Sequence, residues 1–359
     1  MAPLRFAVVG VGDIAQRAVL PAFERRRDVA LTALVTGDRK KGSVLARRYG
    51  APIVASYKDY DALLAGGEID AVYIALPNQQ HRDFVLRAVR AGVHVLCEKP
   101  VATTIAHARE MGRAADRADV RLMVAYRLHF DPATLRAIEL ARDRKAGELR
   151  LFASVFSSPV ERGDIRLQRA GRGGLFDLGI YCVNAARMIF ASEPIEVMAM
   201  HAGLGRGRFR EVPEMTSALL RYPDERVAMF TCSLHAVRTN WWSALGTRQM
   251  VRMEPAYDYQ EPLAIHVRGE RRTERTQSFA LHDQFAAELA YFAECVRKGR
   301  TPEPSIAEGE ADIRILDAID RSARTGRAVR LTGVPRDAKP RKAQKRAFPP
   351  ARKVREVLP

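Results

Sequence analysis

Glycines spaced as in a dinucleotide-binding turn lie near the start of the chain. The segment Gly10-Val11-Gly12-Asp13-Ile14-Ala15 directly follows the apolar run 4–9 and opens a stretch with helical character. A G-x-G-x-x-A turn between a strand and a helix lets the backbone approach a pyrophosphate, whose charge then lies at the helix N-terminus. A purely structural glycine turn is the alternative. It explains less, because both flanking elements that the motif requires are indicated. The predicted cofactor contacts are Gly10, Gly12, Asp13, Ile14 and Ala15.

The end of the next apolar run, 31–35, indicates which dinucleotide is bound. NAD sites usually place an acid there for the ribose 2′-hydroxyl, whereas NADP sites offer cations to the 2′-phosphate. Thr36 takes the position of the acid, and Asp38 is placed to cap the following helix. The cations that follow are either a solvated first turn or phosphate ligands, and cations are mildly unfavourable at a helix N-terminus. The pattern favours NADP over NAD, with contacts from Thr36, Gly37, Arg39, Lys40 and Lys41.

Three side chains suited to proton transfer stand in two further motifs. Glu98-Lys99-Pro100 follows the run 93–96, and open α/β sheets bind ligands at the carboxyl ends of their strands. Asp177 and Tyr181 are spaced i and i+4 in the segment 173–184, which places them on one face of a helix. Taken singly, a strand-end lysine is usually solvated, and a helical Asp/Tyr pair is often a structural hydrogen bond. Beside a nicotinamide, Lys99, Asp177 and Tyr181 together would form a proton-transfer set.

The first 126 residues carry the pattern that positions these motifs. Short runs that are apolar on both faces alternate with amphipathic stretches, as in a parallel sheet covered by helices. The runs are 4–9, 31–35, 71–76, 93–96 and 121–125, and the amphipathic stretches include 81–91 and 103–118. This alternation predicts a Rossmann domain, a doubly wound α/β fold, over residues 1–126.

Beyond residue 148 the period of the pattern changes to two. Apolar and polar residues alternate in the segments 149–156, 195–201, 216–222 and 226–234. Such alternation predicts a large, mostly antiparallel, open-faced sheet, giving an α+β domain over residues 127–334. Helices are expected at 285–296, which stops at Gly299, and at 306–324. The helices near 283–324 are candidates to pack back on the first domain.

The last 25 residues, 335–359, differ in composition from the rest. Between residues 336 and 358 there are nine Lys/Arg and two Asp/Glu, together with several prolines and few apolar residues. Because such a segment cannot offset its ordering entropy by burial, we predict a disordered tail. It is either an electrostatic arm for nucleic acid or an acidic partner, or a solvated extension. The second reading is favoured, so nucleic acid is not an expected partner.

The overall composition is that of a globular protein. Of the 359 residues 47% are hydrophobic and 28% charged, with a net charge of +17. No run approaches the 18 or so apolar residues of a membrane span, and the first residues lack the pattern of a signal peptide, so we expect a cytoplasmic protein. Four single cysteines, without any C-x-x-C pair, argue against a zinc site or a disulfide framework. We expect buried thiols and no metal.

Taken together, these motifs resemble the glucose-fructose oxidoreductase and inositol dehydrogenase superfamily (Gfo/Idh/MocA) over residues 4–331. The likeness rests on the E-K-P motif, on the glycines before Asp177 and Tyr181, and on further short matches: Pro77-Asn78, His81, Tyr126-Arg127, Asp131-Pro132 and 323–327. The chain is most similar to the glucose-fructose oxidoreductase branch, because Thr36-Gly37-Asp38 through Lys41 looks like that branch's NADP-contacting loop. Tyr181 also stands where inositol dehydrogenases have histidine.

The resemblance implies NADP-dependent hydride transfer between the nicotinamide and a sugar carbon, aldose C1 to lactone or the reverse reduction. It makes Tyr181 the acid or base, Lys99 the cation that activates it, and Asp177 the group that orients the sugar hydroxyls and keeps Lys99 charged. It also implies a cis Lys99-Pro100 bond and a homodimer or homotetramer formed through the second-domain sheet. Further cofactor contacts are expected from Leu76, Pro77, Asn78, His81, Glu98, Lys99 and Arg127, and substrate contacts from Lys99, Tyr126, Arg127, Arg166, Asp177 and Tyr181.

The sequence also departs from the branch that it resembles. The export signal and cofactor-retaining N-terminal arm of the periplasmic enzyme are not seen, which favours exchange of NADP in each cycle. Arg172 stands where the family has the first of three glycines. The arginines at 162, 166, 169 and 172 either bind an acidic or phosphorylated sugar or are ordinary surface arginines. A non-catalytic NADP-binding sensor of the same fold is the alternative to an enzyme.

Overall fold

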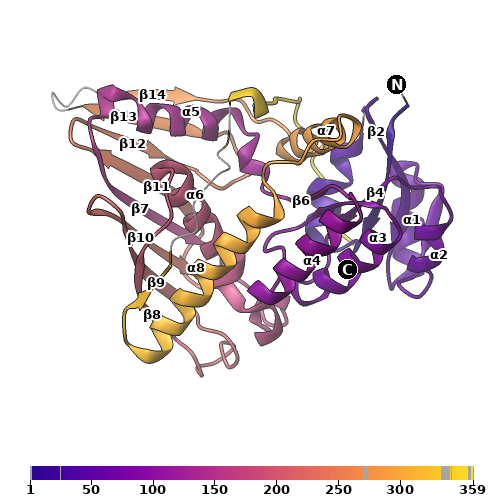
Figure 1. Cartoon of the computed structure of the whole chain (residues 1–359), viewed down its shortest axis with the longest axis horizontal. Helices are drawn as coiled ribbons and strands as arrows, with labels where there is room; N and C mark the ends of the chain where they lie inside the picture. The colour runs from indigo at the N-terminus through magenta and orange to yellow at the C-terminus, as the bar shows by residue number, and fades with distance from the viewer. Residues whose placement is uncertain are drawn as a thin grey trace. The chain divides into compact units, whose positions relative to one another are not determined.

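The computed structural model describes residues 2–24, 26–269, 274–332, 340, 342–354 and 357–358. The chain forms two compact units (Figure 1). Unit 1 comprises Met1–Arg127, His282–Glu310 and Arg346–Pro359, and unit 2 comprises Leu128–Leu281 and Ala311–Lys345. The predicted division near residue 126 therefore separates the first segments of the two units, and later segments return to each.

Unit 1 is built on a six-stranded parallel sheet in the order β3-β2-β1-β4-β5-β6. The strands are β1 (Leu4–Val9), β2 (Val29–Val35), β3 (Ile53–Ala55), β4 (Ala71–Ile74), β5 (His94–Cys97) and β6 (Leu122–Val124). The predicted Rossmann fold is confirmed. The strand β3 was not predicted, since three residues are too few to show a period. The strand order reverses between β1 and β4, the position at which such sheets bind ligands.

The helices of unit 1 include α1, whose two ends are set by a capping side chain and a glycine. They are α1 (Arg39–Tyr49), α2 (Tyr60–Ala65), α3 (His81–Arg90), α4 (Ile105–Arg117) and α7 (Gln284–Arg297), with short turns η1 (Ala15–Val19), η2 (Pro21–Phe23) and η3 (Asn78–Gln80). The predicted cap of α1 is confirmed, because Asp38 accepts a hydrogen bond of 2.9 Å from the Lys41 amide. Gly50, at a φ of 71°, ends the helix.

The core of unit 1 lies on both faces of this sheet. Phe6 of β1 is fully buried, and its ring centroid lies 5.5 Å from that of Phe23 and 6.0 Å from that of Phe292 on α7. The predicted helix 285–296 is therefore confirmed as α7. It packs into unit 1 although it lies about 160 residues beyond the last strand of that unit.

Unit 2 is built on a nine-stranded sheet in the order β14-β13-β12-β11-β7-β10-β9-β8-β15. The strands are β7 (Leu149–Ser157), β8 (Glu196–Ala202), β9 (Met215–Tyr222), β10 (Arg226–Ser233), β11 (Thr239–Gly246), β12 (Gln249–Met253), β13 (Ala264–Gly269), β14 (Glu274–Ser278) and β15 (Val329–Arg330). The pairing is antiparallel except between β7 and β10, which confirms the mostly antiparallel sheet. The alternation in the sequence predicted β7 to β10 but not β11 to β14.

Helices cover one face of this sheet (Figure 1). They are α5 (Pro132–Arg142), α6 (Ile180–Phe190) and α8 (Ile306–Thr325), and the short turns are η4 (Arg127–His129), η5 (Arg144–Ala146), η6 (Ile165–Leu167), η7 (Arg169–Gly171), η8 (Leu175–Gly179) and η9 (Lys342–Gln344). The predicted helix 306–324 is confirmed as α8, which begins in unit 1 and continues in unit 2. Ser322 of α8 accepts a hydrogen bond of 3.0 Å from the Ala199 amide on β8.

The opposite face of the sheet carries exposed apolar side chains in cross-strand register. Met198 of β8 pairs with Leu219 of β9, which pairs with Met229 of β10. Their exposed fractions are 53%, 47% and 42%, and Met200 is 66% exposed. We call Met198, Leu219 and Met229 the apolar row.

The C-terminal segment corrects the prediction of a disordered tail over the residues that the structure describes there. Phe348 accepts a main-chain hydrogen bond of 3.0 Å from Asp283, and the Arg26 guanidinium lies 4.3 Å from its ring centroid. Arg346 pairs with Glu294 at 2.5 Å. Averaged composition misses these contacts, since they depend on single residues with distant partners. Residues 335–339, 341, 355, 356 and 359 of the predicted stretch lie outside the described residues.

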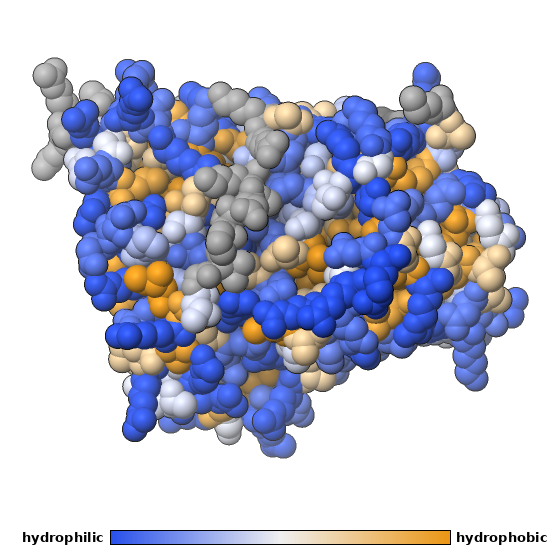
Figure 2. Space-filling view, viewed as in Figure 1, coloured by the Kyte–Doolittle hydropathy of each residue, from blue (hydrophilic) through white to orange (hydrophobic). Residues whose placement is uncertain are grey.

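Surface character, cysteines and membrane-crossing potential were also compared with the sequence predictions. Hydrophilic residues cover most of the viewed face, with hydrophobic residues in smaller groups between them (Figure 2). All four cysteines are free and buried, as predicted. Within the described residues, none of the helices combines the length and the apolar character that a membrane crossing requires.

Candidate functional site

The glycine turn after β1 has the geometry that a pyrophosphate site requires. Gly10 has a φ of 90°, and a Cβ there would lie 2.6 Å from the Ala75 carbonyl oxygen, so only glycine fits. A Cβ on Gly12 would meet nothing within 4 Å, which leaves that backbone open to a ligand. Gly12 and Asp13 are exposed, Ile14 is half-buried and Ala15 is fully buried beneath the turn. These residues fit a dinucleotide.

The end of β2 offers cations rather than a free acid. Thr36 is buried, and its hydroxyl accepts a hydrogen bond of 3.2 Å from the Asp38 amide. Asp38 is engaged in capping α1. Gly37, Arg39 and Lys40 are exposed and Lys41 is half-buried. The cations at 39–41 suit a ribose that carries a 2′-phosphate, because they can pair with its charge.

The turn after β4 contains one correction. Leu76 is buried against the Gly10 turn, and Pro77 and Asn78 are half-buried. His81, predicted to contact the cofactor, is fully buried. Its ring nitrogens lie 2.8 Å from the Leu76 carbonyl oxygen and 2.9 Å from that of Pro100. His81 therefore ties the turn after β4 to the E-K-P motif instead of presenting its ring to a ligand.

The E-K-P motif lies at the carboxyl end of β5, as predicted. Glu98 and Lys99 are half-buried, and the Lys99-Pro100 peptide bond is cis, as expected. Glu98 accepts a hydrogen bond of 2.8 Å from the Tyr73 hydroxyl and one of 3.2 Å from the Lys99 amide. Burial raises the pKa of Glu98, while the charge of Lys99 and the bond from Tyr73 act in the opposite direction.

Tyr126 and Arg127 end the first segment of unit 1. Tyr126 and Arg127 are both buried, and Arg127 donates a hydrogen bond to Gln284 at the start of α7. The Arg127 guanidinium also lies 5.8 Å from the ring centroid of Phe285. Arg127 thus has a structural role that the sequence did not reveal, and its predicted ligand contacts stay predictions.

In unit 2, Asp177 and Tyr181 lie on a helix that begins irregularly. Asp177 belongs to the π-helical turn η8, and Tyr181 is the second residue of α6. Both side chains are half-buried. Single π-helical turns are frequent at functional sites, and the predicted regular helix did not anticipate this one. The Tyr181 ring lies 5.5 Å from that of Phe156 and 5.7 Å from that of Tyr257, two residues that the sequence did not single out.

Arg166 lies beside Asp177, where it was predicted to bind substrate. Its Nη1 is 3.7 Å from Asp177 Oδ2. Its Nε and Nη2 donate hydrogen bonds of 2.9 and 2.7 Å to Asp164, a residue that sequence reasoning missed. Burial alone would raise the pKa of Asp164, but the hydrogen bonds from Arg166 lower it. Two carboxylates thus offset the charge of Arg166.

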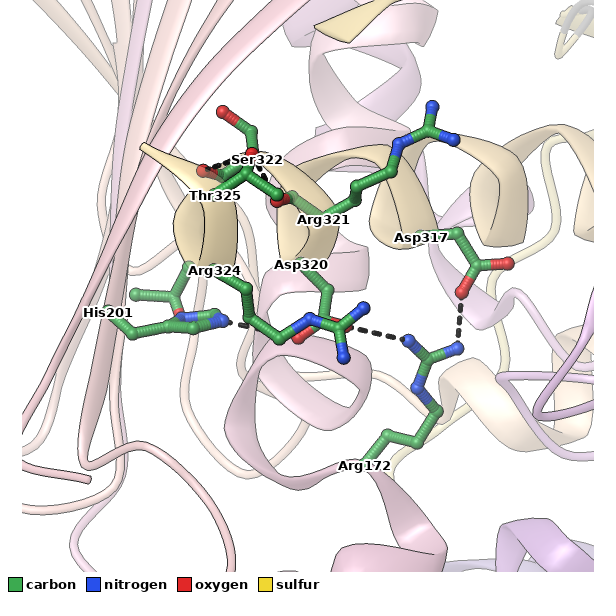
Figure 3. A network of polar contacts seen from close by, with 9 residues as sticks. Arg172, His201, Asp317, Asp320, Arg321, Ser322, Arg324 and Thr325 are labelled. Carbon is green, nitrogen blue, oxygen red and sulfur yellow. Dashed lines mark hydrogen bonds and ion pairs between the residues drawn. The ribbon is translucent and has the colours of Figure 1, made fainter. Parts of the chain in front are cut away.

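Arg172 takes part in a different network, which Figure 3 shows. Its guanidinium pairs with Asp317 and, at 3.3 Å, with Asp320, both on α8, and lies 4.0 Å from the ring centroid of Phe176. Asp320 also lies 3.2 Å from Nε2 of His201. Arg172 has a φ of 64°, a conformation that glycine adopts freely. Of the two interpretations of Arg172, these contacts favour a structural one, in which it anchors the loop before η8 to α8.

Comparison with known proteins tests the predicted family. Residues 4–126 match the model described as "Oxidoreductase family, NAD-binding Rossmann fold", and residues 134–252 match the "GFO/IDH/MocA C-terminal domain". The chain is 31% identical over 338 residues to D-xylose 1-dehydrogenase [NADP(+)] of Haloarcula marismortui, a match that covers 92% of this chain and 93% of the relative. It is 31% identical over 330 residues to dTDP-3,4-didehydro-2,6-dideoxy-alpha-D-glucose 3-reductase of Actinomadura kijaniata, covering 90% and 96%.

Solved structures agree with these matches. The chain is similar to aldose-aldose oxidoreductase from Caulobacter crescentus complexed with glycerol, with a TM-score of 0.87, 34% identity, and coverage of 92% of this chain and 100% of that one. It is also similar to a 3-ketoreductase from Actinomadura kijaniata in complex with NADP and TDP-benzene, with a TM-score of 0.82, 28% identity, and coverage of 89% and 98%. With both domain models matched and the likeness extending along nine-tenths of the sequence, the chain belongs to the Gfo/Idh/MocA oxidoreductase family.

Proposed function

We propose that the protein transfers hydride between NADP and an uncharged sugar, from C1 of an aldose to give the lactone or in the reverse reduction. The observation that carries the proposal is the likeness of the whole chain to an NADP-dependent xylose dehydrogenase and to an aldose-aldose oxidoreductase. The site residues agree with it, since the chain has Lys99, Asp177 and Tyr181 in the expected motifs.

NADP, held by the turn at Gly10 and Gly12 and by the cations after β2, supplies or accepts the hydride when bound. The protein must orient the reacting carbon and move one hydroxyl proton. In the proposal, Tyr181 takes that proton during oxidation and returns it during reduction. A phenol with an ordinary pKa near 10 needs a neighbouring cation for this work at neutral pH, and Lys99 supplies it. Asp177 orients the sugar hydroxyls.

The charges in unit 2 favour an uncharged substrate over an acidic or phosphorylated one. Arg166, the arginine near Asp177, already faces the carboxylates of Asp164 and Asp177. Arg172 is held by Asp317 and Asp320. A phosphate would have to compete with these carboxylates, whereas sugar hydroxyls can hydrogen-bond to them. The names of the relatives, which include xylose and aldose, support the same substrate class.

The apolar row supports an assembly. An exposed row of large apolar side chains on an open sheet is typical of a protein interface. We propose that a second copy of the chain covers this face in a homodimer or homotetramer. The exposed fractions of Met198, Leu219 and Met229 support this proposal.

Replacement of Tyr181 by phenylalanine tests the proposed chemistry. Purified protein is mixed with NADP or NAD and a panel of free, acidic and phosphorylated aldoses, and the absorbance of reduced nicotinamide is followed. The proposal requires reduction by a free aldose, and the Tyr181→Phe variant should lose about 10²-fold or more in turnover while it still binds NADP. Tyr49→Phe, the same change at the C-terminal end of α1, is the matched control and should keep normal turnover.

Two outcomes would contradict the proposal. Near-normal turnover of Tyr181→Phe would remove the proton-transfer role from Tyr181. Tight NADP binding without turnover, with every sugar and with the corresponding lactones and NADPH, would support the non-catalytic sensor instead.

A further inference from the structure

A cluster of two carboxyls and one phenol lies in unit 1, behind the E-K-P motif. Tyr73 of β4 is fully buried, and its hydroxyl lies 2.8 Å from Oε1 of Glu98 and 2.9 Å from Oε1 of Glu288 on α7. Glu288 is also fully buried, and its Oε2 has no hydrogen-bond partner among the described residues. Glu98 is half-buried and directly precedes Lys99. The cluster therefore leads from the motif into the core.

The contacts in this cluster require one more proton than the tyrosine carries. A phenol has a single proton and donates one hydrogen bond, yet Tyr73 approaches two carboxyl oxygens at hydrogen-bond distance. With both glutamates ionised, one contact would join two unprotonated oxygens, and two like charges would face one buried hydroxyl. A proton on one of the carboxyls satisfies both contacts. The cluster then carries a single negative charge.

The surroundings indicate which carboxyl holds this proton. Glu98 accepts the Lys99 amide, and the positive charges of Lys99 and Arg127 act on it. Glu288 lies deeper, and burial, followed by the charge of Glu98, raises its pKa well above the ordinary range. Asp283 adds a further negative charge near Glu288, which Arg127 opposes. Glu288 is therefore the carboxyl that holds the proton, and Glu98 is the one that is ionised.

The outer neighbours of the cluster do not reverse this order. Cys97, which precedes Glu98, is buried, and burial raises the pKa of its thiol well above the ordinary range, so it adds no charge. Asp283 accepts hydrogen bonds of 3.0 and 2.9 Å from the amides of Phe285 and Ala286, as the cap of α7. The positive charge of Arg26 acts on Asp283.

We propose that Glu288 holds a buried proton, shared through Tyr73, that leaves Glu98 as the single anion beside Lys99. The inference rests on the proposed function, in which Lys99 takes part in proton transfer. Glu288 acts through Tyr73 and Glu98, so it is a positioning residue and not a catalytic one. Its effect is that the cluster behind Lys99 carries one negative charge and not two.

The same contacts define a proton shift with balanced bonds. The O–H bond of Glu288 breaks as its proton passes to the Tyr73 oxygen, while the Tyr73 O–H bond breaks as its proton passes to Glu98. The phenol ends neutral, Glu98 becomes neutral and Glu288 takes the negative charge. No proton enters or leaves the cluster. The charge beside Lys99 can thus change without exchange with water.

Infrared spectroscopy tests where the proton lies. At neutral pH the full-length protein should show the carbonyl stretch of a protonated carboxylic acid. The band should vanish in Glu288→Gln, which replaces a neutral acid by a neutral amide of similar shape. It should remain in Glu294→Gln, the matched control on the same helix, because Glu294 pairs with Lys298 and Arg346 and its pKa is lowered to about 2. Absence of the band in the wild type, or its loss in Glu98→Gln but not in Glu288→Gln, would overturn the proposal.

The pH dependence of stability gives a second readout. Above the ordinary glutamate pKa of about 4.3, the unfolded chain releases the Glu288 proton and the folded protein keeps it. Unfolding therefore becomes easier for the wild type as pH rises, until the folded state also releases the proton. The Glu288→Gln variant lacks this loss, so its stability relative to the wild type should grow with pH. A constant difference between pH 4 and pH 8 would contradict the proposal.

The alkaline limb of the pH profile of kcat/KM tests the link to the active site. In Glu98→Gln the ammonium of Lys99 loses its anionic neighbour, so this limb should move to lower pH, whereas Glu294→Gln should leave it in place. An unmoved limb in Glu98→Gln would overturn the effect on Lys99. Because the infrared and stability readouts need no turnover, failure of the proposed function and failure of this inference are distinguishable.

Discussion

Residue chemistry explains most of the candidate cofactor site. Gly10 is required because a Cβ would strike the Ala75 carbonyl, and the open space above Gly12 leaves its backbone accessible. At the end of β2, one carboxylate oxygen of Asp38 caps α1, and three cations follow at 39–41. We propose that these few side chains set the choice of cofactor.

Lys41 provides the test at this scale. In Lys41→Ala the affinity for NADP should fall by about tenfold or more, since a hydrogen bond to a charged group is worth about 1.5–3 kcal/mol. Affinity for NAD should not change, because NAD lacks the 2′-phosphate. Fluorescence titration with both cofactors measures the two dissociation constants. Lys58→Ala, at an exposed lysine of unit 1, serves as control, and equal weakening of NAD and NADP would remove the proposed role of Lys41.

Elements place the residues of unit 2 that the proposed chemistry uses. The loop 169–174 leads into η8, which carries Asp177, and then into α6, which carries Tyr181. Arg172 fastens this loop to α8 through Asp317 and Asp320 (Figure 3). The glycine that the family has at this position would adopt a φ of 64° without strain, but it would bring no charged side chain. In this chain the arginine instead forms ion pairs with Asp317 and Asp320.

Loss of the Arg172 ion pairs should therefore disturb the helix start that carries Asp177 and Tyr181. It should leave the binding of NADP unchanged. Arg172→Ala should lower the free energy of unfolding by about 1–2 kcal/mol, as expected for a half-buried network, and reduce kcat more than it changes the Kd for NADP. Arg172→Lys should recover part of kcat, because it keeps the charge but not the fork of donors. Arg169→Ala, at an exposed arginine of the same loop, should match the wild type. A change confined to the Kd for NADP would contradict this role.

At the scale of the whole molecule, the nine-stranded sheet leaves one face without helices in the described chain. Its apolar row continues across three strands in register, so the exposed side chains form one surface and not scattered sites. Burial of apolar area is favourable by roughly 25 cal/mol per Å², so each side chain of the row that a partner covered would favour association.

A charge placed in the apolar row should prevent assembly. Leu219→Arg is expected to give a monomer by analytical ultracentrifugation at concentrations where the wild type is a dimer or tetramer, because an unpaired charge in an apolar interface is costly. Leu204→Arg changes a leucine of similar exposure in the loop after β8, 55% against 47% for Leu219, and should leave the assembly intact. A monomeric wild type, or an unchanged Leu219→Arg, would show that this face is not the interface.

The sequence by itself determined those features whose causes are local. Several features depend on neighbours only a few residues away, so the sequence pattern alone predicts them. They are the apolar runs, the cap at Asp38, the glycine turn and the helix that stops at Gly299. The E-K-P motif and the Asp177 and Tyr181 spacing identified the family for the same reason. The strands β11 to β14 lack a clear alternation, and β14 is exposed throughout, so periodicity did not predict them.

Only the tertiary structure decided which distant side chains meet. Tyr73 meets Glu288 across 215 residues, Arg172 meets Asp317 across 145, and Leu358 bonds to Gln16 across 342. His81 was predicted to contact a ligand, but its ring is buried and its two nitrogens lie at hydrogen-bond distance from the carbonyl oxygens of Leu76 and Pro100. Such pairings arise from how helices and strands pack. No local pattern specifies a partner's position in space, and burial then sets the charge that each group can carry.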